Sequence, residues 1–113
     1  MIPQIRPAQL AQWLDAVTHQ GQPVLLDVRE PNELATASVK AGAIDLVAIP
    51  MNSVPQRLAE LDAARPIACL CHHGARSHRV AAFLVANGFD TVVNIAGGID
   101  AWATELDASV ARY

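Results

Sequence analysis

Two kinds of hydrophobic pattern alternate along the chain of 113 residues. Residues 7–19 carry apolar side chains at helical spacing and Gly21 follows them, so this segment is predicted to form a covering helix. Other apolar runs are short and lack polar alternation, which is typical of strands covered on both faces of a parallel sheet. The predicted strands are 24–28, 44–49, 67–70 and 91–95.

The segments between the predicted strands have helical character. Pro31 favours the first turn of a short helix that extends to about Ala37. Ser53 and Gln56 have the spacing of a capping box, which predicts that another helix begins at Ser53. Two further helices are predicted over 76–87 and 99–104.

Helix and strand alternate throughout the chain. This order predicts an α/β fold in which a central, mainly parallel sheet of four to five strands carries helices on both faces. The length suits a single domain over residues 1–113, and no repeat or linker interrupts it. Ligands of such sheets bind beyond the carboxyl ends of the strands. Residues 27–30 and 71–77 both follow predicted strands, so they are expected to share one rim.

Composition and charge narrow the range of partners. Hydrophobic residues make up 52% of the chain and charged residues 17%, which is a globular profile. The net charge of −3 argues against nucleic acid as a partner. No membrane partner is expected, because the sequence has no apolar run of membrane-spanning length and residues 1–6 do not resemble a signal peptide. The expected location is therefore the cytoplasm, where Cys69 and Cys71 are expected to stay as thiols.

The run from Cys71 to Ser77 is the first candidate for chemistry. It lies between a predicted strand and a predicted helix, so its backbone N–H groups are expected to converge on one point at the helix N-terminus. An ordinary thiol is mainly protonated at neutral pH, and the helix dipole alone, at about 0.3–1 kcal/mol, is too weak to change that. Hydrogen bonds to a charged acceptor contribute about 1.5–3 kcal/mol each. One or two of them would make Cys71 a reactive thiolate on a surface loop, and Gly74 supplies the backbone freedom that a tight loop needs.

The region around this loop is basic although the chain is acidic. No Asp or Glu occurs between Ala63 and Phe89, a window that contains three arginines and three histidines. Arg76 and Arg79 fall in the first turn of the predicted helix, where a cation opposes the helix dipole. A bound anion would remove this penalty for Arg76, whereas Arg79 is expected to be a solvated surface residue.

Four motifs in order resemble a single-domain rhodanese. They are Asp27-Val28-Arg29-Glu30-Pro31, Cys71-x-x-Gly74-x-Arg76-Ser77, Asn87-Gly88-Phe89, and Asn94-Ile95-x-Gly97-Gly98-Ile99-x-Ala101-Trp102. The resemblance implies a rhodanese-like fold and a sulfurtransferase. In that family the residue matching Cys71 would take sulfane sulfur from thiosulfate or a similar donor, hold it as a persulfide, and pass it to cyanide or a thiol.

The resemblance also implies roles for the other loop residues. Arg76 would bind the substrate, and the backbone around the persulfide would come from His72, His73, Gly74, Ala75 and Ser77. Asp27 and Arg29 would support the loops by hydrogen bonds. The expected partners are a small-molecule sulfur donor and acceptor, with a protein thiol as a further candidate acceptor. No cofactor or metal is expected, because Cys71 carries the sulfur covalently.

One stretch departs from the family pattern. Many relatives have Gly-His-Ile-Pro-Gly-Ala between the first two main strands, whereas residues 37–43 here read Ala-Ser-Val-Lys-Ala-Gly-Ala and contain no histidine. The packing or hydrogen bonding that the histidine provides is therefore missing from this chain.

The same residues also suggest other functions. Cysteine phosphatases have five residues between cysteine and arginine, whereas four separate Cys71 from Arg76, and a smaller loop favours a single sulfur over a phosphate. The loop also lacks an acid to protonate a leaving group. A metal or metalloid site at Cys69, Cys71, His72 and His73 is disfavoured, because neighbours on a strand point in opposite directions. A sulfur-relay or binding module with little free turnover remains an alternative, since it would use the same cysteine.

Overall fold

The computed structural model describes residues 2–40, 42 and 44–113. Five strands form one sheet in the order β1-β5-β4-β2-β3, and each neighbouring pair is parallel. The strands are β1 (Gln4–Ile5), β2 (Val24–Asp27), β3 (Asp45–Ala48), β4 (Ile67–Leu70) and β5 (Val92–Ile95). The α/β architecture predicted from the sequence is confirmed.

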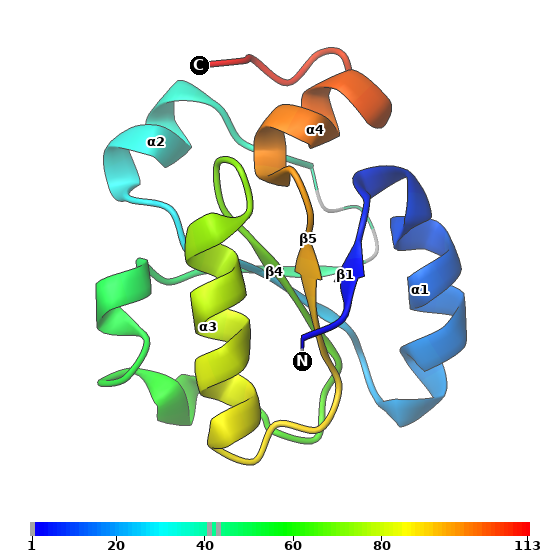
Figure 1. Ribbon diagram of the computed structural model, residues 1–113, viewed down its shortest axis with the longest axis vertical. Coiled ribbons are helices and arrows are strands. Elements are labelled where there is room, and N and C mark those ends of the chain that lie inside the picture. The colour runs from blue at the N-terminus through cyan, green and yellow to red at the C-terminus, as the bar shows by residue number, and fades with distance from the viewer. Residues whose placement is uncertain (1, 41, 43) are drawn as a thin grey trace.

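Within the described residues, four α-helices surround the sheet. They are α1 (Leu10–Val17), α2 (Pro31–Thr36), α3 (Ala75–Ala86) and α4 (Gly98–Glu105). In Figure 1, α1 lies on one side of the central strands and α3 on the other. Alternate residues of β2 accordingly enter different apolar clusters: Leu25 packs in the cluster that contains Trp102 of α4, and Leu26 in the one that contains Leu84 of α3. The covered sheet explains why the strands carry uninterrupted apolar runs.

Two parts of the chain differ from the sequence-based expectation. The predicted helix that begins at Ser53 is wrong: Met51–Ser53 and Leu58–Glu60 are short 3₁₀ helices joined by turns, so no α-helix is present for Gln56 to cap. The helix expected over 7–19 is divided, since 3₁₀ turns at Pro7–Gln9 and Thr18–Gln20 flank α1. β1 was not predicted, because two residues are too few to show a period.

Asp27 and Arg29 form a buried ion pair at the carboxyl end of β2. Their side chains are 2% and 0% exposed, and Arg29 Nη2 lies 2.8 Å from Asp27 Oδ2. Arg29 Nη1 also donates to the carbonyl oxygens of Glu33 (3.2 Å) and Ala37 (2.8 Å). Arg29 therefore ties α2 and the residue after it to the end of the sheet. Of the stretch that departs from the family pattern, Ala41 and Ala43 lie outside the described residues.

The buried pair gives a stability prediction. Arg29→Met leaves the Asp27 carboxylate buried without its cation, so the free energy of unfolding in urea should fall by about 3–5 kcal/mol. The double variant Asp27→Asn, Arg29→Met should be more stable than Arg29→Met alone, because it contains no unpaired charge. A double variant that is less stable than the single variant would contradict this account of the pair.

Candidate active site

Cys71 is the first residue after β4, at the carboxyl edge of the sheet. The chain turns through Gly74, whose φ of 105° lies in the left-handed region, and α3 begins at the next residue. The Gly74 N–H donates to Cys71 Sγ at 3.1 Å. This contact agrees with the expectation that a loop N–H would point at the sulfur, and it is the one backbone donor to Sγ found within the described residues.

The structure buries Cys71, which the sequence had placed on a surface loop. The residue is 1% exposed and packs in the apolar cluster that contains Val80 of α3 and Ile49. Burial follows from its place at the very end of β4, a strand whose four residues are all buried. The surrounding side chains therefore cover the Cys71 thiol almost completely.

Ser77 and Asn94 form a polar network beside the sulfur. Ser77 Oγ lies 3.2 Å from Cys71 Sγ and 2.5 Å from Asn94 Oδ1. The Asn94 amide donates to the carbonyl of Gly74 and to the side chain of Gln4, both at 3.0 Å, so its Oδ1 must be the acceptor. The single Ser77 proton then goes to Asn94 while the thiol is neutral, and rotation of the hydroxyl would bring it to an ionised sulfur.

Asn94 and Gln4 were not among the residues predicted for the site. Asn94 is 1% exposed and stands in the otherwise apolar strand β5. A polar residue inside an apolar run is the signal that could have indicated it, since buried amides need partners. Gln4 carries no such signal, because its strand has only two residues.

The first turn of α4 holds the loop in place. The N–H of Ile99 donates to the Cys71 carbonyl at 2.8 Å, and the N–H of Asp100 donates to the His72 carbonyl at 3.2 Å. A side chain on Gly98 would place its Cβ 2.4 Å from both carbonyl oxygens. The close packing of loop and helix therefore requires glycine at this position.

Arg76 is paired with Glu33, a partner that the sequence did not indicate. Its Nη1 and Nη2 donate to the two carboxylate oxygens at 2.6 and 2.8 Å, with the Arg76 side chain 30% and the Glu33 side chain 15% exposed. The hydrogen bonds from Arg76 hold the pKa of Glu33 at about 2, below its ordinary 4.5. The backbone N–H of Glu30 and the Tyr113 hydroxyl also donate to this carboxylate, at 3.0 and 2.8 Å.

The two loop histidines lie in a stack of rings. The His72 ring packs between His73 and Tyr113, with centroid separations of 3.9 Å on each side. His72 Nε2 is buried and has no hydrogen-bond partner in the part of the chain that the structure describes. Ala75 and His73 are exposed at the rim. Tyr113, which connects Glu33 to His72, was not predicted, because nothing in its neighbourhood of the sequence marks it.

The second cysteine lies inside the sheet. Cys69 is fully buried, and burial raises the pKa of its thiol, which is typical of an unreactive core cysteine. Cys69 and Cys71 are both free thiols. Across residues 2–40, 42 and 44–113, no group of three or more His, Cys, Asp or Glu side chains is arranged to hold a metal ion. The same described residues include no helix with the length and apolar character to cross a membrane.

Comparison with known proteins identifies the family. The model of the rhodanese-like domain matches residues 10–105, so the chain belongs to that family. A protein named sulfurtransferase from Allochromatium vinosum is 36% identical over 80 residues, which are 71% of each chain. A protein named thiosulfate sulfurtransferase GlpE from Pseudomonas syringae is 34% identical over 98 residues, covering 87% of this chain and 85% of its own.

Solved structures agree with the family assignment. A rhodanese-like domain protein from Staphylococcus aureus superposes with a TM-score of 0.75 at 26% identity, and the match covers 99% of both chains. The same fold also occurs inside a much longer chain: the match to the Bacillus anthracis protein CoADR-RHD has a TM-score of 0.77 at 27% identity and covers 96% of this chain but 18% of that one.

The Glu33–Arg76 pair gives a pH prediction. Because the pKa of Glu33 is lowered to about 2, the pair stabilises the folded state above about pH 4.5, and this contribution is lost as the pH falls toward 2. Glu33→Gln, which can still cap α2, should lower the free energy of unfolding by about 1–2 kcal/mol at pH 7. Urea unfolding at several pH values should show the difference from wild type shrinking between pH 4.5 and 2. A difference that stays constant over this range would contradict the assignment.

Proposed function

We propose that this protein is a sulfurtransferase that carries sulfane sulfur as a persulfide on Cys71. The observation that carries the proposal is the placement of the Cys71 sulfur at the N-terminus of α3, where it accepts the Gly74 N–H and lies beside the Ser77 hydroxyl. Membership of the rhodanese-like family and two relatives named as sulfurtransferases support it. The two free cysteines fit a reducing compartment, and we place the protein in the cytoplasm.

The reaction consists of two displacements at sulfur. In the first, the Cys71 thiolate attacks the outer sulfur of thiosulfate, the S–S bond of the donor breaks, and its electron pair leaves with sulfite. In the second, cyanide or a thiolate attacks the outer sulfur of the persulfide, and the electron pair of that S–S bond returns to Cys71. No proton has to be supplied to sulfite, so the reaction does not require an acid in the loop.

The loop residues have distinct roles in this proposal. The Gly74 N–H and the Ser77 hydroxyl stabilise negative charge on the sulfur, and Asn94 positions Ser77. Arg76 uses two of its five N–H groups on Glu33, which leaves the others to contact an anionic donor at the rim. His72, His73 and Ala75 are proposed to contact the substrate at the rim of the loop. Thiosulfate is proposed as a donor because the similar Pseudomonas syringae protein is named for it.

A relay with little free turnover is the second candidate. The observation that favours it is the 1% exposure of Cys71, because a buried sulfur slows exchange with freely diffusing molecules. This candidate uses the same persulfide and differs only in the partner that delivers or removes the sulfur.

Replacement of the two cysteines tests the proposal. Cys71→Ser should abolish the conversion of thiosulfate and cyanide to thiocyanate, because serine cannot form a persulfide, and the circular dichroism spectrum should be unchanged. Cys69→Ser is the matched control, and it should retain activity if it folds. Full activity of Cys71→Ser would remove Cys71 from the reaction.

The positive charge of Arg76 is expected to lower the KM for an anionic donor. Arg76→Ala should raise the KM for thiosulfate about tenfold, since a charge-assisted hydrogen bond contributes about 1.5–3 kcal/mol. Glu33→Gln should change it in the opposite direction, because no neighbouring carboxylate then balances the positive charge of Arg76. Initial rates over a range of thiosulfate concentrations measure both effects. Equal KM values in wild type and both variants would exclude Arg76 from donor binding.

A further inference from the structure

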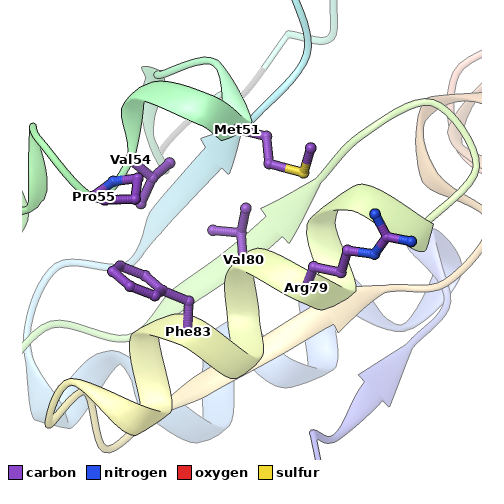
Figure 2. Close-up of a pocket in the computed structure, with 6 residues that line it drawn as sticks. All are labelled: Met51, Val54, Pro55, Arg79, Val80 and Phe83. Carbon is purple, nitrogen blue, oxygen red and sulfur yellow. The ribbon is translucent and has the colours of Figure 1, made fainter.

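An apolar hollow lies against α3 beside the active-site loop. Its volume is about 170 Å³, and it is lined by Met51, Val54, Pro55, Arg79, Val80 and Phe83. In Figure 2, Arg79 is at the end of the hollow nearest the start of α3, and Phe83 is at the other end. Five of the six lining residues are apolar, and Arg79 is the exposed cation among them.

One end of the hollow lies near the rim of the sheet that carries Cys71 (Figure 2). Arg79 and Val80 follow Arg76 by three and four positions, and Phe83 follows by seven, so these residues form one stripe along α3. The opposite wall begins at Met51, whose N–H donates at 3.0 Å to the carbonyl of Val28, the residue after β2. The hollow therefore starts about one helical turn, roughly 5 Å, from Arg76 at the carboxyl edge of the sheet.

Arg79 and Arg76 differ in whether their guanidinium groups already have a partner. Arg76 is engaged with Glu33, whereas the Arg79 guanidinium has no ion-pair or hydrogen-bond partner among the residues that the structure describes. A free guanidinium at the mouth of an apolar hollow favours an anion that carries an apolar arm. The anion would lie on the side of the hollow nearest Cys71, and the arm would extend toward Phe83.

We propose that this hollow is the acceptor subsite and that the acceptor is a cysteine-type thiol, with a carboxylate close to the sulfur and an apolar arm of about five or six carbons. Such an arm corresponds to the size of the hollow, which equals about six water volumes. The inference rests on the proposed function and names its second substrate. The acceptor thiolate attacks the outer sulfur of the Cys71 persulfide, a new persulfide leaves on the acceptor, and Cys71 recovers the electron pair of the broken S–S bond.

Four acceptor thiols distinguish the effect of the carboxylate from the effect of the apolar arm. N-hexanoylcysteine has the carboxylate and the arm, N-acetylcysteine has the carboxylate alone, N-hexanoylcysteamine has the arm alone, and N-acetylcysteamine has neither. The protein is first loaded with sulfur, and its mass confirms the persulfide. The single-turnover rate of discharge is then measured with each acceptor and expressed per thiolate, so that differences in the ionised fraction of the acceptors do not enter. N-hexanoylcysteine should discharge the persulfide about tenfold faster than N-acetylcysteine, because part of its arm is buried.

Three variants assign the effects to residues. Arg79→Met keeps an unbranched apolar stem and removes the charge, so it should slow discharge by the two carboxylate thiols about tenfold and change the two cysteamines by less than about twofold. Phe83→Ala should remove the advantage of the hexanoyl arm over the acetyl group. Arg65→Met is the matched charge control, since Arg65 precedes β4 and lies at the opposite edge of the sheet. It should leave the order of the four acceptors unchanged.

The outcomes separate this inference from the proposed function. If wild-type protein forms no persulfide, the proposed function fails and the acceptor subsite fails with it. If the persulfide forms but the four acceptors discharge it at equal rates, the subsite is excluded while the sulfurtransferase stands. The acceptor subsite would also be excluded if Arg79→Met slowed the carboxylate thiols and the cysteamines equally. In that case the charge of Arg79 would not recognise the carboxylate.

Discussion

The site depends on the contact between the loop after β4 and the first turn of α4. The carbonyls of Cys71 and His72 accept the N–H groups of Ile99 and Asp100, and Gly98 leaves the space in which the two segments meet. These two hydrogen bonds hold the loop backbone at Cys71 and His72. The N–H of Gly74 then donates to the Cys71 sulfur. Residues far apart in the sequence therefore determine the position of one sulfur atom.

Two arginines near the Cys71 sulfur differ in whether a carboxylate balances their charge. Glu33 neutralises Arg76 at the mouth of the loop, and the buried Arg29 reaches the same region through Tyr113, whose hydroxyl lies 3.1 Å from Arg29 Nη1. Arg79 stays unpaired one turn further along α3, within the described residues. The basic stretch of the sequence therefore contains two kinds of cation. Arg76, near Cys71, is balanced by Glu33, whereas Arg79 is unpaired among the described residues and lines an apolar hollow.

The sequence predicted the sheet and the loop because both produce local signals. Apolar runs marked β2 to β5, and the run from Cys71 to Ser77 marked the junction with α3. The Ser53 helix failed because a capping box is a local pattern that tertiary packing can override, and β1 is too short to have a period. The Glu33–Arg76 pair could not be predicted, since 43 positions separate its members and only the fold brings α2 to the loop. Asn94 and Tyr113 are likewise distant from the loop in the sequence, and only the fold brings them to the site.

Cys71 is proposed to accept and donate a single sulfur atom because the loop stabilises negative charge on its sulfur. Intact mass spectrometry after incubation with thiosulfate tests it most directly. We expect one added sulfur atom per chain, located on Cys71 by peptide mapping and removed by cyanide or a thiol reductant. An unchanged mass with thiosulfate and with polysulfide, or an added sulfur that maps to Cys69, would contradict it.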